Sequence, residues 1–197
     1  MDDYAGDVID LLDALHVPEA VVVGLSMGGY VALAMMRLAP RYIHALVLAD
    51  TRPQADTPEG LENRKRMVQL ARERGVAAVA DEMVPKLVGE TTRRERPDVV
   101  ALVRALTLSS SVDGVIGALE AMKTRPDSTP LLASIHMPTL VIVGDEDGIT
   151  PPAVAEAMQR AIAGSQLVVV SGAGHLPNLE DPHAFNTALA GFLEHRV

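Results

Sequence analysis

The chain has 197 residues, of which 48% are hydrophobic, and carries a formal net charge of −9. This length suits one domain around a single core, and the acidity argues against a nucleic-acid partner. No apolar run approaches the ~18 residues of a membrane span, and Met1-Asp2-Asp3 lacks the basic start of a secretory signal. We therefore expect a cytoplasmic protein without a membrane partner. Because the chain has no cysteine, serine must supply the nucleophile in any covalent chemistry of the Ser/Cys type.

The first fifty residues predict a helix followed by a strand–helix–strand unit. Apolar residues at helical spacing over 3–15 indicate the helix, and the β-branched run over 20–25 indicates the first strand. A second helix over 30–39 ends before a proline, and a second strand covers 45–49. A connection this short predicts two parallel strands joined by a right-handed crossover.

The middle of the chain differs from its ends. Residues 51–129 hold 13 of the 17 Lys and Arg but only 12 of the 26 Asp and Glu, and they contain no convincing strand. Helical patterns cover 61–74, 77–87 and 98–108. We expect this stretch to be an inserted helical segment.

Strands return after this insertion. Apolar runs over 139–143 and 166–170 predict two further strands, with a helix over 152–163 between them. A last helix runs from residue 182 to about residue 195. The expected domains are therefore a core made of residues 1–50 and 130–197, and a helical insertion of residues 51–129.

A nucleophile motif follows the first strand, in Gly24-Leu25-Ser26-Met27-Gly28. A G-x-S-x-G sequence between a strand and a helix forces a tight turn that strains the serine and exposes its hydroxyl group. We expect Gly24 and Gly28 both to be required, because the backbone beside Ser26 leaves no room for a side chain. An ordinary strand-to-helix turn is the alternative, and the two glycines argue against it.

Two later loops carry a carboxylate and a histidine. Asp147 follows the third strand and His175 follows the fourth, so both belong to the sheet edge at which open α/β sheets bind ligands. A serine nucleophile needs an adjacent base, and the base needs a carboxylate that orients it. Asp50 also ends a strand and remains an alternative acid, while Asp145 and Glu146 are candidates for solvated loop charges.

We expect neither a metal ion nor a cofactor. Asp145-x-Asp147 has the spacing of calcium ligands, but Ile149 has no side-chain oxygen where the third ligand would be.

Three motifs together resemble the α/β-hydrolase fold superfamily, particularly its small esterase and enol-lactonase-like members. They are Val23-Gly24-Leu25-Ser26-Met27-Gly28-Gly29, Val143-Gly144-Asp145-Glu146-Asp147 with Thr150-Pro151, and Gly172-Ala173-Gly174-His175 with Glu180-Asp181-Pro182. The resemblance implies a partial α/β-hydrolase fold with about four mostly parallel strands, in which residues 51–129 form a helical cap. It also implies that Ser26 is the nucleophile, His175 the general base, Asp147 the orienting acid and the Met27 N–H an oxyanion-hole donor.

The resemblance also implies that two features of the family precede residue 1. One is the loop that supplies the second oxyanion donor, whose loss lowers turnover roughly 100- to 1,000-fold. The other is the strand that flanks the nucleophile strand, so residues 20–25 are expected to form an exposed apolar edge. We therefore expect a homo-oligomer or a partner segment at this edge.

The expected function is hydrolysis of small carboxylic esters or lactones by a serine hydrolase, through an acyl-enzyme intermediate. One alternative is a catalytically impaired, shortened relative that acts as a binding or assembly protein. Another is a peracid-forming or haloperoxidase-like hydrolase that uses the same side chains.

Overall fold

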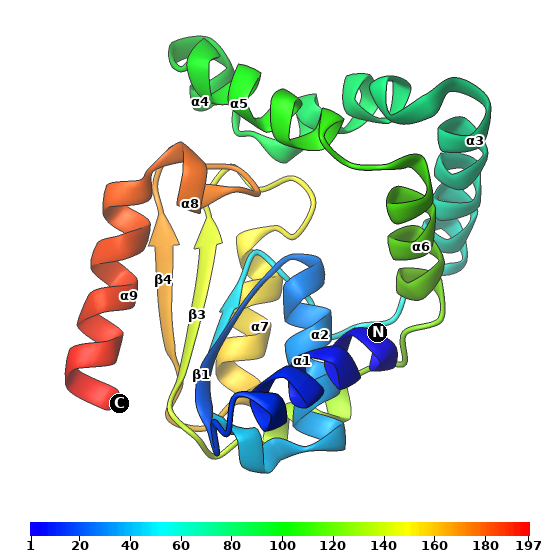
Figure 1. Ribbon diagram of the computed structural model, residues 1–197. Helices are drawn as coiled ribbons and strands as arrows, with labels where there is room; N and C mark the ends of the chain where they lie inside the picture. Colours follow the sequence, from blue (N-terminus) through cyan, green and yellow to red (C-terminus); the bar gives the residue numbers. More distant parts are fainter.

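The fold is built on a parallel sheet of four strands in the order β1-β2-β3-β4 (Figure 1). This computed structural model describes residues 1–197, apart from the side chain of Arg196. The sheet confirms the fold class expected from the sequence. The strands are β1 (Ala20–Leu25), β2 (Ile43–Ala49), β3 (Thr139–Gly144) and β4 (Gln166–Val170).

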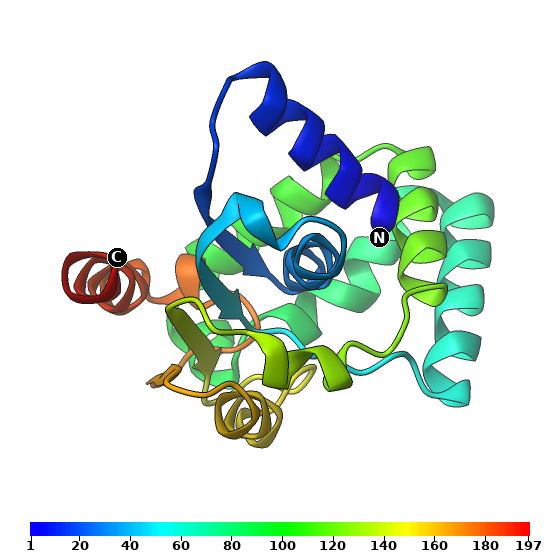
Figure 2. The ribbon, with the colours of Figure 1, turned by 90° about the horizontal axis from the view of Figure 1, so that it is seen from below.

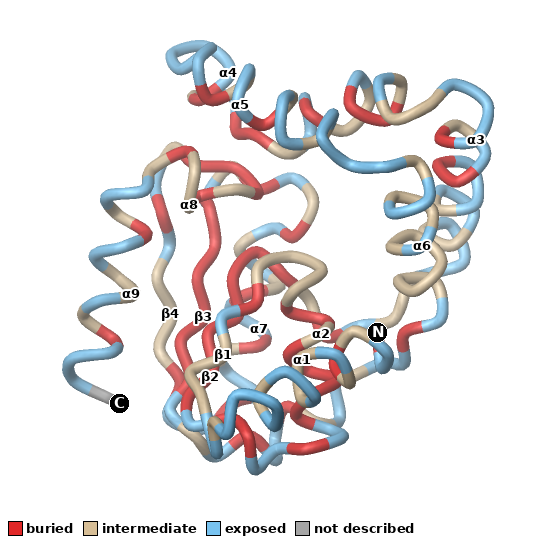
Figure 3. Tube along the Cα trace, viewed as in Figure 1, coloured by how far each residue is buried: buried red, intermediate tan, exposed pale blue. Residues whose placement is uncertain are grey.

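The two central strands, β2 and β3, are the most deeply buried (Figure 3). Both read as continuous apolar runs because helices cover both of their faces. β1 is an edge strand that pairs with β2 alone within the described residues, and its Val23 is 47% exposed. The association of this edge with a second chain or a partner segment stays a prediction.

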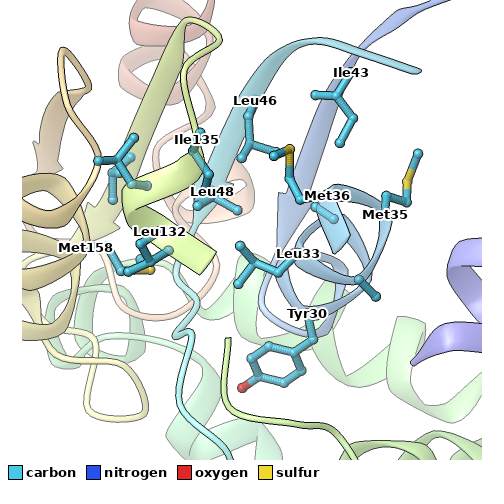
Figure 4. Packing of buried hydrophobic residues seen from close by; sticks show 14 of the residues in the cluster. Tyr30, Leu33, Met35, Met36, Ile43, Leu46, Leu48, Leu132, Ile135 and Met158 are labelled. Atoms are coloured by element: carbon cyan, nitrogen blue, oxygen red, sulfur yellow. The ribbon is translucent and has the colours of Figure 1, made fainter. Parts of the chain in front are cut away.

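Helices cover the two faces of the sheet unequally (Figure 2). Leu46 and Leu48 face one side, where they pack with Leu33 and Met158 (Figure 4). Val47 faces the opposite side, toward the last helix. Three helices lie on the first face and one on the second: α1 (Asp2–Ala14), α2 (Met27–Leu38) and α7 (Pro152–Ala161), and α9 (Pro182–Arg196).

Between β2 and β3 the regular secondary structure of the described chain is helical, and we call residues 51–129 the helical segment. Its α3 bends at Gly75, where φ is 73° and ψ is −179°, so the two helices predicted over 61–74 and 77–87 meet at a kink. The helices α4 (Glu90–Glu95) and α5 (Pro97–Leu108) lie above the carboxyl ends of the strands, whereas α6 (Val112–Lys123) packs beside α3 (Figure 1). The helices of the segment are α3 (Pro58–Leu87), α4, α5 and α6, before the 3₁₀ turn η2 (Thr129–Ser134).

The sequence does not predict α6, because its two glycines lower the helix propensity of the stretch. Tertiary packing overrides that weakness, since Ile116 and Leu119 pack against α3. The Ser111 hydroxyl also caps the helix by accepting a hydrogen bond from Gly114 N.

A buried ionic cluster joins the two ends of the helical segment to the core. Arg125 donates to Asp56 Oδ1 at 2.7 Å and to the Gln54 carbonyl oxygen at 3.0 Å, and its guanidinium lies 4.2 Å from the centre of the Tyr30 ring on α2. Burial alone would raise the pKa of Asp56. Hydrogen bonds from Arg64 and Arg125 outweigh burial and hold that pKa below its usual value.

No single helix among the described residues is long and apolar enough to cross a membrane. The helices α5 and α6 reach that length and apolar character only when they are counted together, and the chain bends by 92° between them.

Candidate active site

Ser26 lies at the sharp turn between β1 and α2. Its φ of 53° and ψ of −112° are strained for a residue other than glycine, which is the conformation that the G-x-S-x-G turn predicts. A Cβ atom at Gly24 would overlap the carbonyl group of Gly28, so this glycine is required by close backbone packing. The same expectation for Gly28 is wrong, because a Cβ atom there meets nothing within 4 Å. The second crowded glycine is Gly29, which packs against the Thr51 side chain.

Gly24→Ala is expected to lower the free energy of unfolding by about 2–4 kcal/mol, because the added methyl group forces two backbone segments apart. Gly28→Ala is the matched control and should be neutral or stabilising by up to about 1 kcal/mol, since alanine favours the first turn of α2. Urea denaturation of both variants measures the difference. Equal midpoints for the two variants would contradict this account of the turn.

Three side chains from separate loops meet at the carboxyl end of the sheet. Ser26 Oγ lies 2.7 Å from His175 Nε2, and His175 Nδ1 lies 2.8 Å from Asp147 Oδ2. His175 is only 2% exposed and Asp147 3%, so water screens their interaction weakly. The geometry is a continuous hydrogen-bonded chain from a hydroxyl group through an imidazole to a carboxylate.

The loop after β3 holds Asp147 as an oriented anion. Oδ1 accepts hydrogen bonds from Ile149 N at 2.7 Å and Thr150 N at 3.0 Å, while the Thr150 hydroxyl donates to Oδ2. Burial by itself would raise the pKa of Asp147. The hydrogen bonds from His175 and Thr150 outweigh it and lower that pKa to about 2, so the carboxylate is ionised at neutral pH.

The histidine loop is held by Glu180, a buried carboxylate in the short helix α8 (Pro177–Glu180). Its Oε1 accepts hydrogen bonds from Gly174 N at 2.9 Å and Leu176 N at 3.0 Å, which flank His175. Its Oε2 accepts from Gly89 N of the helical segment at 2.7 Å. One carboxylate therefore links the position of His175 to that of the helical segment. The sequence motif that contains Glu180 does not indicate this role.

The two other acidic residues of the loop after β3 are not merely solvated. Glu146 accepts hydrogen bonds from the backbone N of Thr91 at 2.8 Å and from its hydroxyl group at 2.6 Å, and these bonds lower the pKa of Glu146. Asp145 accepts hydrogen bonds from Gly172 N and the Ser171 hydroxyl group. These contacts tie the loop to the helical segment on one side and to the histidine loop on the other.

Asp50, the alternative acid, lies beside this chain of contacts but outside it. Its Oδ1 accepts from Gly144 N at 2.9 Å, and no hydrogen bond joins it to His175 in the described structure. Asp50, Asp147 and His175 each offer one potential metal-ligating atom, and these atoms lie within 4.8 Å of one another. Since His175 Nδ1 and Asp147 Oδ2 already bond to each other, the cluster has the pattern of an acid–base pair rather than of a cation site.

The fold and this site define a class of protein. The family profile described as the alpha/beta hydrolase fold matches residues 1–182. The chain belongs to the α/β-hydrolase fold family.

Its relatives include lactone and ester hydrolases. The chain is 29% identical to 3-oxoadipate enol-lactonase 2 of Acinetobacter baylyi, over 98% of this chain and 71% of the relative. It is 30% identical to a pimeloyl-[acyl-carrier protein] methyl ester esterase of Neisseria meningitidis, over 89% and 69%. A thermophilic esterase from Thermogutta terrifontis superposes with a TM-score of 0.93 and 43% identity, over 96% of this chain and 70% of that one. The family and these relatives support hydrolase activity.

Proposed function

We propose that the protein is a serine hydrolase that cleaves small carboxylic esters or lactones through an acyl-enzyme intermediate. The observation that carries the proposal is the hydrogen-bonded chain from Ser26 through His175 to Asp147. The similarity to an enol-lactonase and to esterases supports a carboxylic ester or lactone as the substrate class.

In the proposed reaction Ser26 Oγ attacks the acyl carbon while its proton passes to His175 Nε2. Asp147 stabilises the imidazolium that forms, and the N–H of Met27, at the start of α2, donates to the oxyanion. His175 then protonates the leaving alkoxide as the acyl-enzyme forms. A water molecule attacks the acyl carbon, giving one proton to His175, and the tetrahedral intermediate releases the acid as that proton returns to Ser26.

In this proposal the helical segment acts as a cap that covers the acyl group of the substrate when it is bound at Ser26. Its contacts with the catalytic loops support that role, because Gly89 and Thr91 hydrogen-bond to Glu180 and Glu146. Movement of the cap would therefore shift the loops that carry the proposed base, His175, and the proposed acid, Asp147.

A fluorophosphonate probe tests the proposal, because it reacts only with an activated serine. We expect one adduct per chain, mapped by mass spectrometry to the peptide that contains Ser26, together with turnover of p-nitrophenyl butyrate. Ser110→Ala, which removes an exposed serine far along the chain, is the control and should leave labelling intact. Labelling without turnover would favour the impaired relative, and a folded protein that does neither would refute the proposal.

A further inference from the structure

Asp50 is a buried carboxyl group that the proposed reaction does not use. It is 1% exposed, and its Oδ2 is fully buried without a hydrogen-bond partner among the described residues. A buried carboxylate oxygen without a hydrogen-bond partner is strongly unfavourable if the group is ionised. Its backbone φ of 45° is also unusual for a residue other than glycine, so the surrounding structure holds Asp50 in place.

The titratable groups that face Asp50 determine whether its carboxyl group is ionised. They are Asp147 from the loop after β3, Glu180 from α8 and His175 from the loop after β4. Two carboxylates as close as Asp50 and Asp147 cannot both ionise readily, so their proximity favours one proton held on the pair. The bonding pattern locates that proton.

Asp147 accepts hydrogen bonds from two backbone N–H groups, a hydroxyl group and an imidazole, all of which favour its anion. In the part of the chain that the structure describes, Asp50 accepts one hydrogen bond, from Gly144 N. Burial and the neighbouring Asp147 accordingly raise the pKa of Asp50 to about 8, while that of Asp147 is lowered to about 2.

We propose that Asp50 is protonated in the resting enzyme and that its Oδ2–H donates a hydrogen bond to the Asp147 carboxylate, which makes Asp50 a positioning residue for the triad acid. The role in catalysis rests on the proposed function. The protonated state does not, because it follows from the unpaired oxygen and the adjacent carboxylate. Asp50 thus supports Asp147 without adding a second negative charge beside His175.

Asp50→Asn reproduces the proposed protonated state. Its amide oxygen can accept from Gly144 N, its NH₂ can donate to Asp147, and asparagine tolerates a positive φ. Asp50→Gly also tolerates this φ but removes both hydrogen-bonding atoms. For p-nitrophenyl butyrate at neutral pH, we expect kcat to stay within about threefold of wild type in Asp50→Asn and to fall about 10- to 100-fold in Asp50→Gly.

The pH dependence of stability tests the proton itself and requires no substrate. The pKa of Asp50 rises from 3.8 in the unfolded chain to about 8 in the folded one, so its stabilisation is complete below pH ~4 and is lost as the pH rises through 8. Asp50→Asn lacks this loss. Between about pH 5.5 and 8.5 its melting temperature should therefore gain roughly 5 °C or more relative to wild type.

Asp10→Asn is the matched control, because it removes an exposed carboxylate from α1 and should show no such gain. If Asp50→Asn follows the wild-type stability profile across this pH range, Asp50 is not protonated and the proposal is overturned. If Asp50→Asn loses as much kcat as Asp147→Asn while staying folded, an ionised Asp50 is required and the proposal is again overturned. A protein without esterase activity would still show the stability shift, which separates this inference from the proposed function.

Discussion

Replacing Ser26 with alanine is expected to lower kcat for p-nitrophenyl butyrate by about 10⁴- to 10⁶-fold. The change removes the atom that attacks the acyl carbon in the proposed reaction, so only the weak catalysis by the rest of the site remains. Steady-state turnover at neutral pH, compared with the uncatalysed rate, measures the loss. Fluorophosphonate labelling should disappear in the same variant.

The Ser26→Ala result is informative only if the variant is folded. Alanine adopts the strained φ of 53° no more easily than serine, and the change removes the hydrogen bond to His175 Nε2, so a modest loss of stability is expected. Thermal unfolding monitors this loss, and Ser110→Ala should retain wild-type turnover. Equal rates in the wild type and Ser26→Ala would show that the observed hydrolysis does not involve this serine.

Asp147→Asn is expected to lower kcat about 10⁴-fold through a change of tautomer. The asparagine oxygen can still accept from Ile149 N and Thr150 N, which turns its NH₂ group toward His175 Nδ1. The imidazole must then accept at Nδ1 and carry its proton on Nε2, so it cannot take the proton of Ser26. KM should change much less than kcat, because Asp147 lies behind the histidine.

A pH measurement adds a second test of Asp147. Its pKa is lowered from 3.8 to about 2 on folding, so its stabilisation is present above pH ~4 and is lost as the pH falls through 2. The shift corresponds to about 2 kcal/mol, which Asp147→Asn should lack in acid unfolding experiments. Asp50→Asn is the comparison variant, because Asp50 lies near the same histidine. This variant should retain most of the wild-type turnover. The opposite order of the two variants would make Asp50 the triad acid.

Much of the core could be predicted from local sequence. β1 and β4 have the bounds that their β-branched runs predict. Helices cover both faces of a parallel sheet, so each of its strands is marked in the sequence by a short apolar run between turn residues. The family could also be recognised, since its three motifs are each contained in a few consecutive residues. The helices α4, α6 and α8 could not, because they are short or glycine-containing and depend on packing and caps for their stability.

The sequence by itself determined the residue types available for chemistry, their order along the chain and the sheet edge that presents Ser26, Asp147 and His175. Only the tertiary structure decided which carboxylate contacts the histidine, that Glu180 links the histidine loop to Gly89, and that Asp50 keeps an unpaired oxygen beside Asp147. The physical reason is the separation along the chain of the groups that interact. A turn or a strand depends on neighbours within a few residues, whereas these hydrogen bonds and the pKa values they set depend on groups that the chain brings together only when the sheet has formed.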